Sequence, residues 1–285
     1  MRKELHEANR VAWNEATKAH NSHKHDQADF FREGGSTLFP DEIELLGDVN
    51  GRALLHLQCN AGQDTLSMAR LGATVTGVDI SDEAITFARQ LSIDSGIPAT
   101  FHRADVYDWL HEQPGAQFDI VFSSYGALVW LSDLRTWARG IAKVLEPGGR
   151  VVLLDFHPVL SMLDDNWRIT YPYSSGGQPL TFEEGIGDYV AMAGPALAPS
   201  GYLEGVKDFR NSHASHEFAW GLADIVTALL DARLILRTFR EYPYTNGASL
   251  RPGMREIAGK RFIPPADLPE IPLMFGIGAQ KETSA

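Results

Sequence analysis

The residues best placed to do chemistry follow two apolar runs in the first third of the chain. Residues 53–57 read Ala-Leu-Leu-His-Leu, and the small and polar residues 58–62 follow directly. A second apolar run, residues 74–78, ends at the acid Asp79. At the end of a strand, Gly62 would let the backbone approach a ligand, and Asp79 could accept two hydrogen bonds from a ribose diol. The pattern predicts half of a nucleotide-binding α/β sheet; the alternative is an ordinary βαβ unit with a solvated acid.

The glycine count in the first loop bears on which nucleotide would bind. A dinucleotide fold needs Gly-x-Gly-x-x-Gly, so that a pyrophosphate can lie on a helix N-terminus. Here the equivalent positions hold Gln58, Asn60 and Gly62. A ligand without phosphates tolerates this loop better, which favours S-adenosylmethionine (SAM).

At these residues the chain resembles the class I SAM-dependent methyltransferases. The resemblance is to a subgroup whose first motif reads His-Leu-Gln-Cys-x-x-Gly-x-Asp-Thr-Leu, matched by residues 56–66. It continues through Asp79 and through the segments 103–106, 118–124 and 145–154. The resemblance covers residues 50–157 well and residues 221–280 in outline.

The resemblance implies a cofactor site on this sheet. The loop Cys59 to Gly62 would face the methionine part of SAM, Asp79 the ribose, Ile80 one face of adenine, and Asp105 with Val106 the adenine edge. The residues predicted to contact the cofactor are Trp13, Gln58, Cys59, Asn60, Ala61, Gly62, Asp64, Asp79, Ile80, Asp105, Val106 and Ser123. The chain departs from the family at His56, where an acid is usual, and at Gln58 and Asn60, which stand for two glycines. The side-chain amides of Gln58 and Asn60 can donate and accept hydrogen bonds and so replace some contacts.

Methyl transfer from a sulfonium requires mainly that the acceptor lie in line with the methyl group. A base is needed only if the acceptor is a hydroxyl or a protonated amine. The candidate bases are His157, which follows the fifth strand, and His213 and His216, which precede the late helix. The alternative for His157 is that it caps the strand end or contacts the following insertion.

Other reactive side chains have simpler explanations. Cys59 is the single cysteine, and we interpret it as a small packing residue rather than a nucleophile. His20, His23 and His25 lack the accompanying acids of a zinc or iron site, so no metal is expected. Trp13 can pack on the sulfonium or the substrate.

Alternating strands and helices must position these residues. We expect a helical arm at 3–33, a helix at 41–46, and strands at 53–58, 74–79, 99–103, 118–123 and 150–156, the last after a turn at 146–149. A helix at 222–230 and strands at 234–241 and 273–279 follow. The predicted fold is α/β, a doubly wound, mostly parallel seven-stranded sheet whose last strand is antiparallel, as the family implies. Residues 1–46 would form a lid, 47–157 and 217–285 the SAM-binding domain, and 158–216 a small β-rich cap over the substrate.

Composition narrows the class of partner. The chain has 285 residues and a net charge of −12, with a sequence pI near 5.2. This charge disfavours nucleic acid, and no apolar stretch is long enough for a membrane span, so we expect a cytoplasmic protein with a small-molecule acceptor. The Asn/Asp-Pro-Pro-Tyr/Phe signature of nucleic-acid amino methylation is missing at residues 123–125. Methylation of oxygen and of nitrogen both stay open. The rivals are a SAM-binding protein without catalysis and an NAD-dependent oxidoreductase, the latter disfavoured by the missing glycines.

Overall fold

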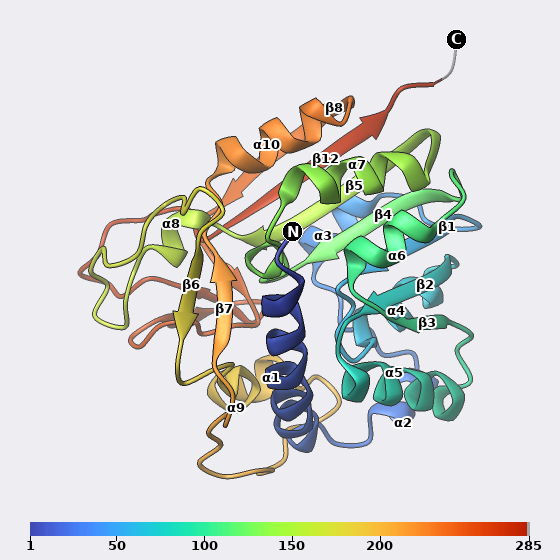
Figure 1. The fold of residues 1–285 in the computed structure, drawn as a ribbon. Helices are drawn as coiled ribbons and strands as arrows, with labels where there is room; N and C mark the ends of the chain where they lie inside the picture. The colour runs from blue at the N-terminus through green and yellow to red at the C-terminus, as the bar shows by residue number, and fades with distance from the viewer. Residues whose placement is uncertain (284–285) are drawn as a thin grey trace.

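One seven-stranded sheet organises the molecule. The computed structural model describes residues 1–283. Its strand order is β3-β2-β1-β4-β5-β12-β8, with β12 antiparallel to both neighbours and the remaining pairs parallel (Figure 1). The strands are β1 (Ala53–Leu57), β2 (Thr74–Asp79), β3 (Thr100–Arg103), β4 (Phe118–Ser124), β5 (Leu145–Phe156), β8 (Leu234–Tyr242) and β12 (Met274–Lys281). The predicted fold class is confirmed.

Helices cover both faces of the sheet, which explains why the strands are apolar on both sides. Leu54 packs in one cluster with Leu46 and Met68, whereas Leu55 packs in another with Trp137. The covering helices are α3 (Pro40–Leu46), α4 (Gln63–Arg70), α5 (Asp82–Ser95), α6 (Val106–Glu112), α7 (Leu134–Val144) and α10 (Leu222–Asp231). A strand buried on both faces reads as a continuous apolar run, as residues 53–57 do.

The order of the strands creates a crevice between β1 and β4. From β1 the chain continues to β2 and β3 on one side, whereas β4 and β5 lie on the other. Crossovers leave in opposite directions at such a point, so the loops at the carboxyl ends of β1 and β4 separate and admit a ligand.

The N-terminal arm forms two helices, α1 (Lys3–Ser22) and α2 (Gln27–Arg32). In Figure 1, α1 runs beside strand β7 on one side and near α5 on the other. Polar contacts attach it to the start of α5, since Asn14 Oδ1 accepts a hydrogen bond from Ser81 Oγ at 2.8 Å. Arg10 pairs with Asp82 in the same region.

The segment after β5 is mostly loop. It contains α8 (Pro158–Ser161), α9 (Tyr189–Ala193), the 3₁₀ turn η2 (Gly194–Ala196), and a two-stranded antiparallel sheet of β6 (Pro179–Phe182) and β7 (Ser215–Phe218). Another 3₁₀ turn, η1 (Leu128–Trp130), lies between β4 and α7. Strand β7 of this small sheet lies beside α1 in Figure 1.

Two features differ from the expected element order. Strand β5 begins at Leu145, not at residue 150, because Leu145 pairs with Phe118 and Arg150 with Ile120, so the predicted turn at 146–149 is a bulge in the strand. The sequence pattern also predicts no strand in residues 243–272. This segment nevertheless contains a three-stranded sheet of β9 (Thr245–Asn246), β10 (Arg255–Ile257) and β11 (Arg261–Ile263).

Within residues 1–283, no helix combines the length and the apolar character that crossing a membrane requires.

Candidate functional site

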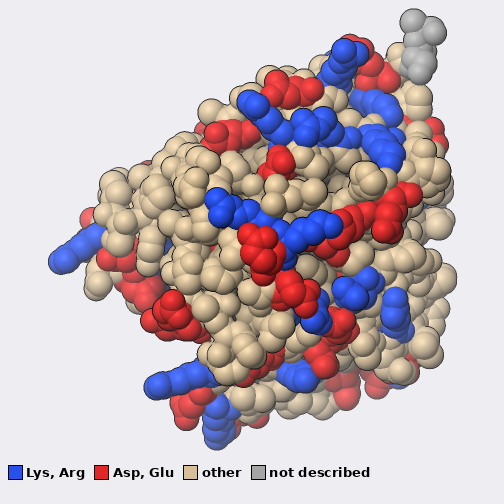
Figure 2. Space-filling view, in the orientation of Figure 1, with Lys and Arg blue, Asp and Glu red and all other residues tan. Residues whose placement is uncertain are grey.

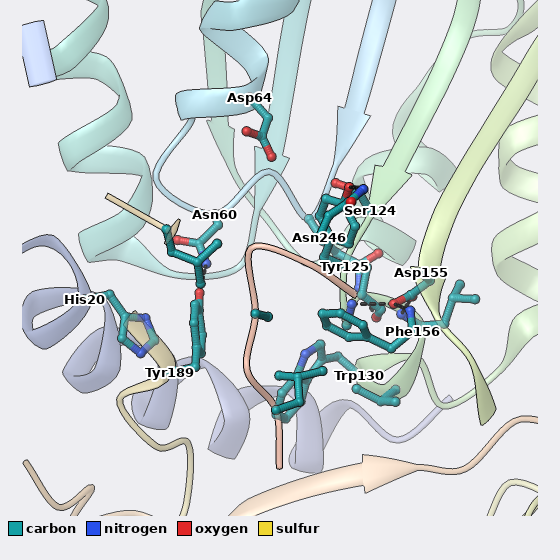
Figure 3. A pocket seen from close by; sticks show the side chains of 18 of the residues that line it. His20, Asn60, Asp64, Ser124, Tyr125, Trp130, Asp155, Phe156, Tyr189 and Asn246 are labelled. Atoms are coloured by element: carbon teal, nitrogen blue, oxygen red, sulfur yellow. Dashed lines mark hydrogen bonds between the residues drawn. The ribbon is translucent and has the colours of Figure 1, made fainter. Parts of the chain in front are cut away.

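A cavity of about 960 Å³ lies at the carboxyl ends of the central strands. The loops after β1 and β4 line it from the sheet, α1 and α2 from the arm, and segments 185–200 and 246–251 from the remaining elements. Figure 3 shows Asn60, Tyr189 and His20 on one side of it and Tyr125, Asn246 and Phe156 on the other. Chain segments far apart in the sequence therefore close one compartment.

The loop after β1 is shaped by left-handed backbone and is held by Asp79. Gln58, Asn60 and Gly62 have φ values of 55°, 47° and 81°. The Asn60 N–H donates to Asp79 Oδ2 at 2.8 Å, and the Ser81 N–H donates to Asp79 Oδ1 at 2.9 Å. Burial raises the pKa of Asp79, while these backbone donors oppose the rise. Asp79 lines the cavity, so its carboxylate both fixes the loop and faces the ligand space.

Three of the predicted cofactor residues in this region do not line the cavity: Ala61, Gly62 and Ser123. A Cβ on Gly62 would lie 2.7 Å from Ala88 Cβ and 2.9 Å from Phe101 Cζ. The glycine therefore permits α5 and β3 to pack against the loop. The hydroxyl-bearing residue that reaches the cavity from β4 is Ser124 rather than its neighbour Ser123.

Cys59 lines the cavity and is almost fully buried in the cluster that contains Phe31 and Phe101. Burial raises the pKa of its thiol well above the ordinary value, which is the behaviour of a packing residue and not of a reactive thiolate.

At one end of the cavity, Asp105 begins α6. Its Oδ1 accepts the Tyr107 N–H at 2.9 Å, and its Oδ2 lies 2.7 Å from His6 Nδ1. His6 comes from α1, and its Nε2 lies 2.9 Å from Ser132 Oγ. Asp105 lines the cavity together with Ile80 and Val106, the pair predicted to contact adenine.

At the other end, the arm brings a lysine to the cavity, and α4 brings an acid. Lys24 and Asp64 both line the cavity, and burial raises the pKa of Asp64 while it lowers the pKa of Lys24 to about 8. In residues 1–283 the Lys24 ammonium makes no hydrogen bond or ion pair with a protein group. Asn60 Nδ2 donates to Tyr189 Oη at 3.3 Å, and the Tyr189 ring lies 4.0 Å from that of His20. This end offers a cation and an anion, as a zwitterion requires.

The loop after β4 is held by buried acids and amides. Asp155, at the end of β5, accepts hydrogen bonds from the N–H groups of Gly126 and Leu128 (Figure 3). Asn246 lies in strand β9, which the sequence pattern does not predict, and its Nδ2 donates a hydrogen bond to Tyr125 Oη at 3.0 Å. The polar groups at this side of the cavity are thus preorganised by bonds within the protein.

None of the three candidate histidine bases lines the cavity. His157 is buried, with Nε2 2.9 Å from Glu241 Oε1, and its Nδ1 accepts the Val159 N–H at 3.1 Å. His213 is exposed, and His216 Nδ1 lies 3.0 Å from Thr181 Oγ1 on β6. His157 thus caps the N-terminus of α8, whereas the alternative from the sequence was a cap of the strand end or a contact with the insertion.

The predicted residue Trp13 lines the cavity and packs edge-on against Trp130, at 5.4 Å between ring centroids.

Four further residues line the cavity that sequence reasoning missed: His6, Lys24, Asn246 and Glu217. Glu217 is the only one with a local signal, because it adjoins His216 in a strand whose side chains alternate between two faces.

The arm histidines have structural contacts. His20 Nε2 lies 3.0 Å from the Gly187 carbonyl oxygen, and His23 Nε2 lies 2.9 Å from Asp188 Oδ2, so both tie the arm to the segment after β5. Across residues 1–283, no three side chains of histidine, cysteine or acid type gather as a metal site would require.

The fold is that of solved SAM-dependent methyltransferases. One from Mesorhizobium loti superposes with a TM-score of 0.54 and 19% identity, covering 88% of this chain and all of that one. A [4+2]-cyclase, SpnF, shares the fold at a TM-score of 0.50 and 14% identity, covering 90% of this chain and 80% of the other. The fold by itself therefore does not determine the reaction.

Residues 54–149 match the model of the methyltransferase domain. A ubiquinone biosynthesis O-methyltransferase from Xanthomonas euvesicatoria pv. vesicatoria is 36% identical over 119 residues, which are 41% of this chain and 49% of that protein. The chain spans about half the length of the curated relatives it matches.

Proposed function

We propose that this protein is a SAM-dependent methyltransferase that transfers the sulfonium methyl group to an oxygen atom of a small molecule. The observation that carries the proposal is the convergence of Asp79, Ile80, Asp105 and Val106 on one cavity at the strand-order reversal, within a matched methyltransferase domain. Adenine would lie against Ile80 and Val106, with its amino group toward Asp105 and the ribose diol on Asp79.

The methionine part of SAM would lie at Lys24 and Asp64. Its ammonium would pair with the Asp64 carboxylate and its carboxylate with the Lys24 ammonium, which has no other protein partner among residues 1–283. These two side chains would supply contacts that the family draws from the acid and glycines replaced here by His56, Gln58 and Asn60. The amide of Asn60, at the same end of the cavity, would add a hydrogen bond.

A small acceptor agrees with the shape and charge of the site. The cavity volume is at the upper end of the range for drug-sized ligands, so it can hold a cofactor and a compact acceptor. Figure 2 shows basic and acidic side chains interspersed on the face that carries α1, with no continuous basic surface for a nucleic-acid backbone. The names of the curated relatives favour oxygen over nitrogen as the acceptor atom.

The second candidate is a protein that binds SAM and does not transfer its methyl group, which the cyclase with this fold keeps open. Isothermal titration with SAM, its demethylated product and NAD, followed by assay of product release with phenol, benzyl alcohol and aniline, separates the two. Micromolar SAM binding with methylation of a hydroxyl compound supports the proposal. SAM binding with no transfer to any acceptor favours the second candidate, and binding of NAD alone contradicts both.

A further inference from the structure

Strand β7, which pairs with β6, carries an acid into the cavity. The pairing sets Thr181 opposite His216 and Leu180 opposite Glu217. Because side chains alternate along a strand, His216 contacts Thr181 outside the cavity, whereas Glu217 and Ala219 line it.

Within residues 1–283, the Glu217 carboxylate makes no hydrogen bond or ion pair with another protein group. The cation that acts on it is Arg251, whose Nε donates to the Leu163 carbonyl at 3.0 Å and whose Nη1 donates to the Leu250 carbonyl at 2.7 Å. Burial raises the pKa of Glu217 to about 7, and Arg251 opposes the rise. Near neutral pH the Glu217 carboxylate can therefore accept a proton from a ligand, because no other protein group among residues 1–283 binds it.

Strand β7 is fixed beside the loop that follows β4. Strand β7 packs against η1, which continues that loop, and against α1. Asn9 of α1 holds the strand by two bonds of 2.8 Å, one to the His216 carbonyl oxygen and one from its N–H. Glu217 therefore has a set position relative to the crevice between β1 and β4.

Few charges surround this position. Of the elements packed against β7, α1 brings His6 and His20 to the cavity and Glu15 to Ser212 outside it. The strand β6 and the turn η1 contain no titratable residue. Arg251 completes the set, so the protonation of Glu217 depends mainly on its burial.

We propose that Glu217 is the general base for a hydroxyl acceptor, an inference that rests on the methyltransferase function proposed above. The acceptor oxygen forms a bond to the sulfonium methyl carbon as the carbon–sulfur bond breaks, and that electron pair becomes a lone pair of the thioether product. The hydroxyl proton passes to a Glu217 carboxylate oxygen and then to solvent. No further reactant is needed.

Two probes that differ in their need for a base test this role. At pH 8, phenol, with a pKa near that of tyrosine, about 10, is protonated. 4-Nitrophenol is a much stronger acid, because its nitro group withdraws electrons from the oxygen, and it is mostly ionised at that pH. Replacing Glu217→Gln should lower kcat with phenol by roughly 100-fold and remove the rise of rate with pH through neutrality, because general-base catalysis contributes factors of this order. The rate with 4-nitrophenol should fall less than about tenfold. Equal losses with both phenols would overturn the base and indicate a positioning or structural role.

A titration that needs no acceptor accompanies the assay. Protein labelled with ¹³C at glutamate carboxyl groups should lose, in Glu217→Gln, one resonance that titrates in the neutral range. The exposed Glu183, in the loop after β6, gives the matched control Glu183→Gln, which should keep both the neutral-range resonance and the activity. If the resonance lost in Glu217→Gln titrates near the ordinary glutamate value, the proposed role of Glu217 as a base is refuted, even when neither phenol reacts. Failure of the wild type to bind SAM would instead contradict the proposed function.

Discussion

Replacing Gly62→Ala should separate packing from ligand binding at the loop after β1. Gly62 has φ +81° at the start of α4, and an added methyl carbon would lie 2.7 Å from Ala88 Cβ and 2.9 Å from Phe101 Cζ. Both neighbours belong to a buried cluster, so neither can move aside without moving α5 or β3. We therefore expect the substitution to lower the free energy of unfolding of the whole protein.

Two contributions set the magnitude. Overpacking a close-packed core costs about 1–3 kcal/mol, and left-handed backbone costs a residue with a Cβ roughly 1–2 kcal/mol. We expect the free energy of unfolding of Gly62→Ala to fall by about 2–5 kcal/mol in urea titrations followed by tryptophan fluorescence. Gly96→Ala is the matched control, because Gly96 has φ +71° and no atom within 4 Å of its added Cβ, so only the backbone cost applies.

The result that refutes this reasoning concerns the difference between the two variants. If Gly62→Ala is no less stable than Gly96→Ala and its SAM dissociation constant rises more than tenfold, the glycine serves ligand approach and not packing. The prediction from the sequence, that Gly62 contacts the cofactor, would then be the better account.

Four further predictions concern single side chains. Asp79→Asn should weaken SAM binding at least tenfold in calorimetry, since each hydrogen bond to a charged acceptor contributes about 1.5–3 kcal/mol; an unchanged dissociation constant would remove Asp79 from the site. Lys24→Met should weaken SAM about tenfold yet leave adenosine binding unchanged, and equal losses for both would argue against a carboxylate contact. Because burial raises the pKa of Glu217 to about 7 from its ordinary value of 4.5, the folded state binds more protons than the unfolded chain between these pH values, so stability should fall as pH rises through this window. Urea unfolding at pH 5 and pH 8 should show a smaller fall for Glu217→Gln than for the wild type. His157→Asn should lower stability by about 1 kcal/mol, through its bond to Glu241, and leave turnover unchanged; a loss of turnover at full stability would restore His157 as a base.

The sheet could be predicted because its signals are local. Residues 53–57 form an apolar run that is buried on two faces, and Asp79 ends the neighbouring run, residues 74–78, where a ligand site must lie. The small sheet of β9, β10 and β11 gave no such signal, since its strands have two or three residues each and β10 is exposed throughout. Its pairing depends on the fold around it and not on its own pattern.

Only some of the site residues could be predicted from the sequence, and the reason is related. Asp79, Ile80, Asp105 and Val106 lie beside the strands that carry them, so a motif locates them. The choice between His216 and Glu217 depends on the register of β7 against β6, and a shift by one residue exchanges the two faces. The partners of a strand are set by packing across the molecule, which the local sequence does not encode.

Some segments that line the cavity lie within the methyltransferase-domain match, and others lie outside it. This difference indicates which residues determine the specificity for the acceptor. The methyltransferase-domain match ends at residue 149, and it contains the residues proposed for adenine and ribose. Glu217, Asn246 and Arg251 lie beyond it, and Lys24 precedes it. These segments, which close the cavity, thus lie outside the matched domain. An acceptor should therefore be sought from the chemistry of these segments: a hydroxyl that can reach Glu217, on a molecule compact enough to share the cavity with the cofactor.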